Sequence, residues 1–329
     1  MANSSLPPVS FILTGYNQAH LIDDAIDGAL AQDYPSLQIV LTDDRSDDET
    51  FAIMRTRAEA YRGPHQIVTT QPSENRGTFG NIHHAFGHAT GELIVFAGGD
   101  DVSYPNRTRA IIDCWLDSGA SALYSRYDVI DEDGHLLERD WKPDAEDLWL
   151  LDYFPEQEVE PLHGASMACH RSVLEDYPAD GVRIRSEDAY LTLMLALDRK
   201  KVAYIDRSLV RYRKHPGAIT NETPPPPTMA GVAARERGQM RFSESQKALL
   251  ELFSERLHER GGAKGIDHIL KDDLELFALR SCWDRSTLRD RVAALPAARR
   301  RGHLDWLLPR AIGFRTFVAI KALALKARN

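Results

Sequence analysis

The sequence predicts an α/β fold, a mostly parallel sheet flanked by helices and followed by a helical C-terminal region. Over the first two-thirds of the 329 residues, short runs of β-branched and apolar residues alternate with segments in which apolar residues recur every three or four positions. The first pattern is typical of buried strands and the second of amphipathic helices. Their repeated alternation favours a parallel sheet covered on both faces, with ligands bound beyond the carboxyl ends of its strands.

Four strands of this sheet are predicted in the first hundred residues. Helices are expected between them, because the intervening apolar residues follow helical spacing. In the second helix, Asp47 is expected to be the N-cap of an apolar face that begins at Phe51. The predicted strands are Val9–Thr14, Leu37–Thr42, Gln66–Thr70 and Glu92–Ala97.

The pattern is less regular after Pro105, which suits the first turn of a helix. Strands are expected at Ala122–Ile130 and Leu136–Arg139, around a turn at Asp133-Gly134. A helix is expected at Ala189–Leu197. The order of strands in this part of the sheet does not follow from the sequence.

Four consecutive prolines, Pro224–Pro227, exclude both a helix and a central strand. Helices are expected beyond them, at Glu244–Arg260 and Asp267–Arg280, because helix-forming residues prevail there. The sequence thus indicates a first domain, a Pro-rich linker or crossing loop, and a helical region with a basic apolar tail. Their expected ranges are 1–223, 224–240 and 241–329.

The composition is that of a globular protein that does not bind nucleic acid. Apolar residues make up 43% and charged residues 27% of the chain, which permits a packed core and argues against disorder. A formal net charge of −9 disfavours a polyanionic partner. The three cysteines are widely spaced, which fits a reducing compartment. Without an evident secretory signal or membrane-spanning run, a cytoplasmic protein is expected.

Three acidic pairs stand out, at Asp43-Asp44, Asp100-Asp101 and Glu187-Asp188. The first two follow predicted strands, and the third precedes a predicted helix. Taken singly, such pairs are typical of solvated turns and of the first turns of helices. Gathered in one cleft, they would be costly unless a cation or a reacting group used them. The sequence therefore indicates a functional site at the edge of the sheet.

These segments resemble family 2 glycosyltransferases of the GT-A fold, over roughly Val9 to Thr220. Thr14-Gly15-Tyr16-Asn17 is similar to the family's Pro-x-Tyr-Asn turn, with threonine in place of proline. Thr42–Thr50 resembles its Asp-Asp-Gly-Ser-x-Asp motif, and Ala97–Pro105 resembles its Asp-x-Asp-Asp segment. Arg185–Tyr190 is similar to its Glu-Asp motif.

The resemblance implies a nucleotide site at the ends of the first two strands. Tyr16 would pack on the base beside Thr14, and Asp44 would accept an imide N–H, which favours uracil. Asp101 would contact the ribose or a metal-bound water. The full set of implied nucleotide-binding residues is Thr14, Tyr16, Asn17, Asp43, Asp44, Gly77, Asn81, Gly99 and Asp101.

The resemblance also implies a metal site. Asp100 aligns with the family's metal ligand, and His215 aligns with a histidine that approaches the metal or the diphosphate. A surface histidine in a basic loop is the alternative for His215. Oxygen ligands of this kind select Mg²⁺ or Mn²⁺. Gly98 departs from the family, in which Asp is common at this position, so the site has one carboxylate fewer.

Asp188 aligns with the family's catalytic base, which takes the proton of the acceptor hydroxyl. The departing nucleoside diphosphate would be stabilised by the cation. Glu187, His163 and Ser166 are implied on the acceptor side. The alternatives are a charged first helical turn for Glu187-Asp188 and a core histidine for His163. A single displacement with one base inverts the anomeric configuration.

A basic, apolar tail covers residues 303–329. From Arg299 onward, eight Lys or Arg residues stand against Asp305 alone, a charge of +7, so the rest of the chain carries −16. This composition suits an anionic membrane surface. At helical spacing, Phe314, Val318 and Leu325 share the arc of the charged residues, so docking on this chain or on a partner subunit is the alternative.

The sequence thus predicts a metal-dependent inverting transfer of a sugar from a nucleotide-sugar, a UDP-sugar being favoured, to a glycan or lipid-linked glycan, as in surface polysaccharide synthesis. The protein would be cytoplasmic or peripheral at the inner face of the membrane. A degenerate member that binds nucleotide-sugar without turnover is one alternative, favoured by Gly98. A sugar-phosphate nucleotidyltransferase is another, disfavoured because Thr14–Asn17 lacks a Gly-rich loop with a basic residue.

Overall fold

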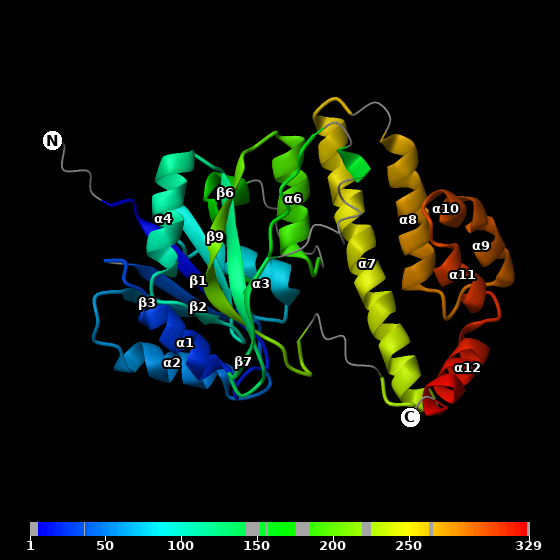
Figure 1. Ribbon diagram of the computed structural model, residues 1–329, viewed down its shortest axis with the longest axis horizontal. Helices are drawn as coiled ribbons and strands as arrows, with labels where there is room; N and C mark the ends of the chain where they lie inside the picture. The colour runs from blue at the N-terminus through cyan, green and yellow to red at the C-terminus, as the bar shows by residue number, and fades with distance from the viewer. Residues whose placement is uncertain are drawn as a thin grey trace. The chain divides into compact units, whose positions relative to one another are not determined.

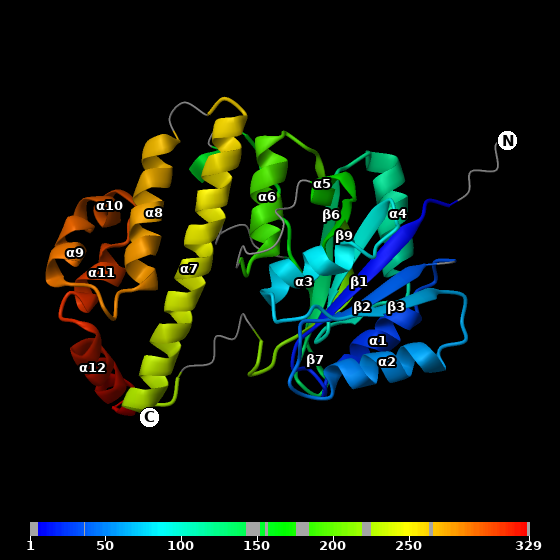
Figure 2. The ribbon, with the colours of Figure 1, turned by 180° about the vertical axis from the view of Figure 1, so that it is seen from behind.

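The computed structural model describes residues 6–35, 37–142, 152–154, 157–175, 184–218, 225–262 and 266–327. The chain divides into two compact units, Met1–Asn221 and Glu222–Asn329. The first is an α/β unit and the second is helical throughout its described residues (Figures 1 and 2).

In the described residues, the N-terminal unit is built on a single sheet of nine strands. The strand order is β3-β2-β1-β4-β8-β6-β9-β5, and β7 pairs with β6. The strands are β1 (Val9–Gly15), β2 (Gln38–Asp43), β3 (Gln66–Thr70), β4 (Leu93–Gly98), β5 (Val102–Ser103), β6 (Ala122–Ile130), β7 (Leu136–Trp141), β8 (Ala168–His170) and β9 (Val202–Arg213).

The half of the sheet formed by β1 to β4 is parallel, as the sequence predicts. Its central strands are buried on both faces, because helices cover both sides; Phe11, Ile12 and Leu13 are each 0% exposed. The hairpin of β6 and β7 also forms as expected. The observed architecture confirms the predicted fold class, a mixed and mostly parallel sheet with flanking helices.

Helices α1, α2 and α4 pack on one face of the sheet, and α3 and α6 lie on the other (Figures 1 and 2). The ring of Phe79 meets that of Tyr190 edge-on at 5.2 Å between centroids, which joins α3 to α6. The helices are α1 (Ile22–Leu30), α2 (Thr50–Ala60), α3 (Gly77–Phe86), α4 (Arg107–Ser118), α5 (Ser172–Glu175) and α6 (Glu187–Leu197).

Three strands, β5, β8 and β9, were not predicted. In β9 the pairing with β6 jumps from Ile205 to Ser208, so Asp206 and Arg207 form a bulge that interrupts the strand pattern. β5 and β8 have only two and three residues, too few to carry a periodic signal. Each is defined by the neighbouring strands with which it pairs, β9 for β5 and β4 with β6 for β8.

Two boundary predictions were wrong. Asp47 does not cap α2; instead the carboxylate of Asp48 accepts the backbone N–H of Thr50 at 2.9 Å. The expected linker over 224–240 is shorter than predicted, because α7 already begins at Met229. The Thr228 hydroxyl caps that helix by accepting the backbone N–H of Gly231. Residues 219–224, which include the end of the resemblance, lie outside the described residues.

In the C-terminal unit, α8 and α12 pack against α7. In both views α9, α10 and α11 lie on the side of α8 that is away from α7 (Figures 1 and 2). None of its described helices, nor any in the N-terminal unit, is long and apolar enough to cross a bilayer. The helices are α7 (Met229–Glu259), α8 (Asp267–Ser281), α9 (Leu288–Ala293), α10 (Leu295–Arg300), α11 (Leu304–Arg310) and α12 (Phe314–Lys326).

A buried ion cluster fastens the tail to α7. Glu236 is 1% exposed and accepts from Arg310 at 3.1 Å and from Lys321 at 2.8 Å. The Arg310 guanidinium also lies over the rings of Trp306 and Phe317, at 4.7 and 4.6 Å from their centroids. Two of the tail's cations therefore point into the protein and are neutralised there.

The Glu236 cluster predicts a large stability effect. Glu236→Gln leaves two cations against an uncharged group in a buried place, and we expect the free energy of unfolding to fall by about 3 kcal/mol. Urea denaturation followed by circular dichroism measures it. Glu255→Gln, an exposed change on the same helix, should cost less than about 0.5 kcal/mol. Equal stability of the two variants would contradict the cluster's role.

Candidate active site

The carboxyl ends of β1, β2 and β4 meet at one edge of the sheet. Gly15 pairs with Asp43, and Thr14 pairs with Gly98. The turns that leave the three strands therefore start side by side. The backbone N–H of Asp44 donates to the carbonyl of Gly15 at 2.8 Å, which joins two of these turns. Parallel α/β sheets bind their ligands at this edge.

Asp44 is buried beside the start of α3. Its carboxylate accepts the backbone N–H of Arg76 at 2.8 Å, and its carbonyl accepts the side-chain amide of Asn75 at 2.9 Å. Burial raises the pKa of the Asp44 carboxyl to about 6, against the opposing effect of the N–H groups of Arg76 and Gly77. At neutral pH the group is ionised and has lone pairs left for a ligand N–H.

Tyr16 and Asn17 form the turn after β1. Tyr16 is 46% exposed, so its ring is available to a ligand. Asn17 has a left-handed φ of 53°, and its side-chain oxygen accepts the backbone N–H of Asp47 at 2.9 Å. Asn17 thus braces the turn after β2, while Thr14 donates its hydroxyl to the carbonyl of Ala97 at 3.4 Å.

Two predicted nucleotide-binding residues have internal partners instead. Asp43 is 0% exposed and accepts from the Ser46 backbone and the Gln71 amide, at 2.9 and 2.6 Å. Asn81 is 1% exposed, and its side-chain oxygen accepts the hydroxyl of Thr42 at 2.6 Å. These bonds close the loop after β2 and hold α3 against β2. Both residues are buried and bind other parts of the chain, so their expected contact with nucleotide stays a prediction.

Gly77 and Gly99, two of the predicted nucleotide-binding residues, stand at positions that disfavour any side chain. Gly77 opens α3 with a φ of 72°, a conformation that L side chains rarely adopt. At Gly99 an added Cβ would lie 2.5 Å from the side-chain oxygen of Gln18 and 2.6 Å from Ile22. The loop after β4 can therefore pass close to α1 only with glycine at this position.

Asp100 and His215 are in contact. The Nε2 of His215 lies 3.1 Å from a carboxylate oxygen of Asp100. The side chain of His215 is 5% exposed and that of Asp100 is 23% exposed. A carboxylate and an imidazole brought together from distant segments, and still reachable from solvent, form a pair of ligands suited to a divalent cation.

Asp101 turns inward, away from this pair. Its carboxylate accepts the backbone N–H of Arg213 at 2.8 Å. Burial, and then the charge of Asp100, raise the pKa of Asp101 well above its usual range, although Arg107 and Arg213 oppose the shift. Asp101 therefore fixes the loop to β9, whereas the expectation was a contact with ribose or a metal-bound water.

Two arginines that the sequence analysis missed support this loop. Arg213 donates to the carbonyl of Asp100 at 2.9 Å and to the carboxylate of Asp24 at 2.8 Å. Arg107 is 0% exposed and donates to the carbonyls of Phe96, at 2.6 Å, and Ala165, at 3.3 Å. Burial lowers the pKa of Arg107 to about 10, so it stays charged at neutral pH. In the sequence, Arg107 stands four residues before Ile111, on the apolar face of α4, and this position indicates a buried arginine.

At Gly98, where the family commonly has Asp, the structure shows which group lies next to the missing side chain. A Cβ at this position would lie 2.6 Å from a carboxylate oxygen of Asp100. In this chain Asp100 thus occupies space next to the missing side chain. An acidic residue at 98 would require Asp100 to move away from its contact with His215.

Asp188 lies in the first turn of α6. One carboxylate oxygen accepts the backbone N–H of Gly164 at 3.0 Å, and the other accepts the backbone N–H of Ala189 at 2.8 Å. An added Cβ at Gly164 would lie 2.9 Å from Glu187 and 3.4 Å from Asp188. The glycine therefore permits the loop after 163 to approach both acids. Burial, and then the charge of Asp188, raise the pKa of Glu187 to about 8.

His163 belongs to an aromatic cluster next to Asp188. Its ring centroid lies 4.8 Å from that of Tyr127, 6.0 Å from Tyr212 and 6.4 Å from Trp141. Burial lowers the pKa of His163, against the opposing charge of Asp188. The Nδ1 atom of His163 has no hydrogen-bond partner among the described residues. The histidine is therefore neutral at pH 7 and packed, with one ring nitrogen available.

Ser166 is not on the surface of the site. It is 1% exposed, and its hydroxyl donates to the carbonyl of Ser125 at 2.9 Å. Ser166 holds the loop before β8 against β6, and its acceptor-side role stays a prediction.

The end of β9 connects the Asp100 pair with the surroundings of Asp188. Tyr212 contacts His163 through its ring, and the next residue, Arg213, binds Asp101 through its backbone. Strand β9 therefore reaches both halves of the site within two residues. The three acidic pairs of the sequence converge on one side of the N-terminal unit, with Asp44 and Asp100 on loops and Asp188 in the first turn of α6.

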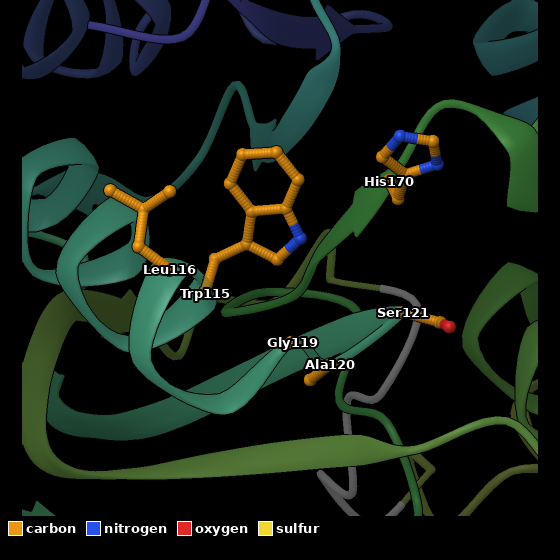
Figure 3. Close-up of a pocket in the computed structure, with 6 residues that line it drawn as sticks. All are labelled: Trp115, Leu116, Gly119, Ala120, Ser121 and His170. Carbon is orange, nitrogen blue, oxygen red and sulfur yellow. The ribbon is translucent and has the colours of Figure 1, made fainter. Parts of the chain in front are cut away.

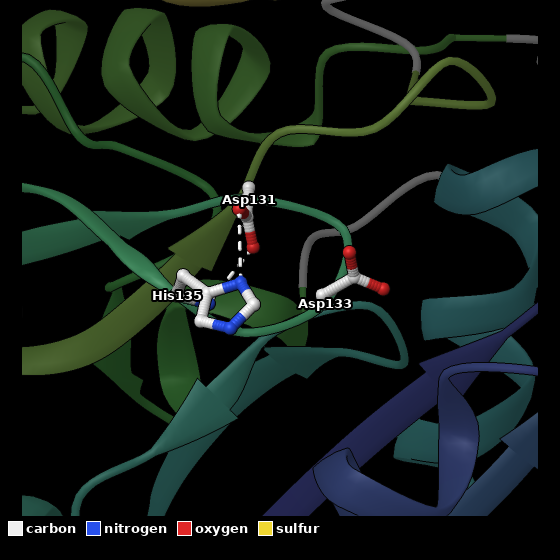
Figure 4. Close-up of side chains that lie close together, drawn as sticks. All are labelled: Asp131, Asp133 and His135. Atoms are coloured by element: carbon white, nitrogen blue, oxygen red, sulfur yellow. Dashed lines mark hydrogen bonds and ion pairs between the residues drawn. The ribbon is translucent and has the colours of Figure 1, made fainter.

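A second acidic cluster lies in the turn between β6 and β7. Ligand atoms of Asp131, Asp133 and His135 lie within 4.8 Å of one another (Figure 4). The Asp131 carboxylate accepts the backbone N–H of His135 at 2.8 Å, which lowers the pKa of Asp131. This bond closes the turn, and it explains why the side chains lie close together.

A cavity of about 370 Å³ lies at the other end of the sheet (Figure 3). Trp115 and His170 line it, with ring centroids 6.0 Å apart. His170 pairs with Leu93, the first residue of β4, whereas Asp100 follows the last. The cavity is therefore separate from the acidic site.

Two solved structures resemble this chain in fold. TarS of S. aureus in complex with UDP-GlcNAc gives a TM-score of 0.53 at 15% identity, covering 95% of this chain and 90% of that one. The mannosyltransferase PcManGT of Pyrobaculum calidifontis, in complex with GDP-Man and Mn²⁺, gives 0.54 at 18% identity, covering 97% and 88%. These similarities show that the chain has the GT-A fold.

The sequence comparisons concern the first part of the chain. The succinoglycan biosynthesis protein ExoO of Rhizobium meliloti is 32% identical over 136 residues, 41% of this chain and 38% of ExoO. The chain thus spans less than half of the length of the curated relatives that it matches. The family model described as glycosyl transferase family 2 matches residues 10–177, just over half of the chain. With the GT-A fold and the convergent acidic loops, this match shows that the chain belongs to glycosyltransferase family 2.

Proposed function

We propose that this chain catalyses the metal-dependent, inverting transfer of a sugar from a nucleotide-sugar, preferably a UDP-sugar, to a hydroxyl of a glycan or lipid-linked glycan. One observation carries the proposal. The end of β9 brings the Asp100–His215 pair and the Asp188 loop to the same edge of the sheet, so groups suited to a leaving diphosphate and to a reacting hydroxyl share one site.

The nucleotide base would bind at Asp44 and Tyr16. The ionised carboxylate of Asp44 accepts an imide N–H, and the exposed ring of Tyr16 offers a stacking surface. Uracil presents such an N–H, and guanine presents one as well. TarS was solved with UDP-GlcNAc and PcManGT with GDP-Man, so both donors fit the fold. We favour uracil because Asp44 follows the family's uracil-binding pattern.

Asp100 and His215 would hold the cation. Their ligand atoms lie 3.1 Å apart, so both can turn toward one ion. An imidazole with a carboxylate suits Mn²⁺ better than Mg²⁺, which prefers oxygen ligands. When bound, the ion offsets the negative charge of the departing nucleoside diphosphate. Asp101 and Arg213 keep the loop of Asp100 in place for this role.

Asp188 would take the proton of the acceptor hydroxyl. The N–H groups of Gly164 and Ala189 fix the direction of its carboxylate. Glu187, with a pKa of about 8, is mostly protonated at neutral pH and can donate a hydrogen bond to a sugar oxygen. Attack by that hydroxyl on the anomeric carbon, opposite the leaving diphosphate, inverts the configuration.

The aromatic cluster beside Asp188 supports a sugar acceptor. Trp141, Tyr212 and His163 present ring surfaces, on which the C–H face of a sugar can pack. Similarity to ExoO, a succinoglycan biosynthesis protein, agrees with a role in polysaccharide synthesis. A lipid-linked glycan would place the enzyme at the inner face of a membrane.

The base assignment predicts a selective loss of turnover. Asp188→Asn should lower kcat by about 10²–10⁴-fold, because the amide cannot take a proton, and should leave the Kd for UDP unchanged. Release of nucleoside diphosphate from UDP-, GDP- and dTDP-sugars in the presence of Mn²⁺ measures kcat, and calorimetry measures the Kd for UDP. Asp198→Asn, just past the other end of α6, is the control. Loss of UDP binding in Asp188→Asn would refute the assignment, and wild-type protein that binds UDP without turnover would favour the degenerate alternative.

The pKa of Asp44 predicts the pH dependence of nucleotide binding. Below about pH 6 the carboxyl is protonated and cannot accept the imide N–H, so the Kd for UDP should rise about tenfold per pH unit. Calorimetry between pH 5 and about 8 measures this. Asp44→Asn should bind weakly at every pH and show no such slope. A wild-type profile that is flat across pH 6 would contradict the role of Asp44.

The metal pair predicts which residues set the requirement for Mn²⁺. Asp100→Asn or His215→Gln should raise the Mn²⁺ concentration for half-maximal activity by at least about tenfold. Manganese EPR in the presence of UDP gives the affinity independently of turnover. His135→Gln, in the turn between β6 and β7, should behave as wild type. If His135→Gln raised the required Mn²⁺ concentration and Asp100→Asn and His215→Gln did not, the metal would belong to the Asp131–His135 turn.

A further inference from the structure

The C-terminal unit carries an unusual share of exposed apolar side chains. Among the described residues, thirteen large apolar side chains are exposed, and six of them lie within residues 288–323. Their exposed fractions range from 52% to 67%. Exposed apolar groups gathered in this way mark an interaction surface. The six, here called the C-terminal apolar surface, are Leu288, Val292, Leu308, Ile312, Ile320 and Leu323.

Their spacing places them in pairs on single helix faces. Leu288 and Val292 are four residues apart on α9, and Ile320 and Leu323 are three apart on α12. The third pair, Leu308 and Ile312, lies at the end of α11 and just beyond. Arg291 of α9 donates to the carbonyl of Ala311 at 3.1 Å, so α9 lies against the turn between α11 and α12.

The inner side of the same helices is fastened to α7 and α8 by buried acids. Glu236 binds Arg310 and Lys321. Asp272 and Asp273, 5% and 2% exposed, bind Arg300 and Arg301 at 2.6 and 2.8 Å. Val318 of α12 packs against Val232 of α7. The sequence suggested that charges and apolar residues share one arc. In the structure Phe314, Val318 and Leu325 pack on the inner side with the paired cations, while Ile320 and Leu323 stay exposed.

The outer side keeps its own positive charge. Arg289, Arg299, Arg315 and Lys326 are exposed, and in the described residues from 288 onward the acids are Asp290 and Asp305 alone. Asp290 is engaged in the capping box of α9. The apolar surface is therefore accompanied by exposed basic charge that outnumbers the nearby acids, the composition that binds the interface of an anionic bilayer.

We propose that the C-terminal apolar surface binds anionic lipid membranes peripherally, with its apolar side chains at the level of the headgroups and its basic residues against acidic lipids. A second copy of this chain is a poorer occupant, because a twofold interface would bring the same basic patch against itself. The proposal does not depend on the catalytic roles above.

Vesicle binding by the full-length protein tests the proposal. Removal of residues 303–329 is unsuitable, because it would strip the cations from buried Glu236. The double variant Ile320→Ser with Leu323→Ser keeps that cluster and should lower partitioning onto vesicles of phosphatidylglycerol and phosphatidylcholine by about tenfold or more. Arg315→Gln with Lys326→Gln should lower it by about fivefold per charge at low salt, and the effect should shrink at high salt.

Matched controls come from the N-terminal unit. Leu136→Ser with Leu137→Ser removes two exposed leucines from β7, and Lys200→Gln with Arg207→Gln removes two exposed cations. Both should bind vesicles as wild type does. Circular dichroism melting of every variant distinguishes lost binding from lost folding, since the substituted side chains are exposed and should leave the melting temperature unchanged.

Four results would overturn the proposal. Three concern vesicles: the wild type does not bind anionic vesicles, it binds pure phosphatidylcholine equally well, or both tail variants bind as the wild type does. The fourth is a concentration-dependent dimer in sedimentation that only Ile320→Ser with Leu323→Ser abolishes, while this variant still binds vesicles. The last would assign the surface to a second copy. Turnover on a soluble acceptor reports the catalytic site separately, so failure of one idea leaves the other intact.

Discussion

The burial of the Asp101 carboxyl group, which binds the backbone of Arg213, is the constraint on which the active-site edge depends. A carboxylate removed from water is costly unless hydrogen bonds and opposite charges accompany it. Here Arg107 and Arg213 are buried with it, one from α4 and one from the end of β9. Because each arginine also binds carbonyls on other segments, the buried arginines beside Asp101 fix the relative positions of several loops.

This arrangement explains how two kinds of chemistry share one edge. Arg107 links the end of β4 with the loop before β8, and Arg213 links the loop of Asp100 with β9. The loop before β8 also carries Gly164, whose N–H holds Asp188. The Asp100–His215 pair and Asp188 therefore belong to one hydrogen-bonded framework. Such a framework holds reacting groups in place without relying on the flexibility of long loops.

The same principle operates in the C-terminal unit. There Glu236 is the buried acid that gathers cations from α11 and α12. Net charge computed along the tail hides this division, because inward and outward basic residues count equally. Once the inward ones are paired, what remains on the outside is an apolar surface with a modest positive charge, which is a different object from a uniformly basic tail.

The sequence by itself determined the parallel half of the sheet and the place of the acids at its edge, because burial of a strand and the turn after it are encoded by neighbouring residues. It also identified the family through short motifs. It did not show which acids and amides, such as Asp43, Asn81 and Asp101, bind other parts of the chain. Asp101 and Arg213 are 112 positions apart, and no local pattern records such a partnership. Only the tertiary structure decided which polar groups are engaged internally and which remain for a ligand, since this depends on contacts between distant segments.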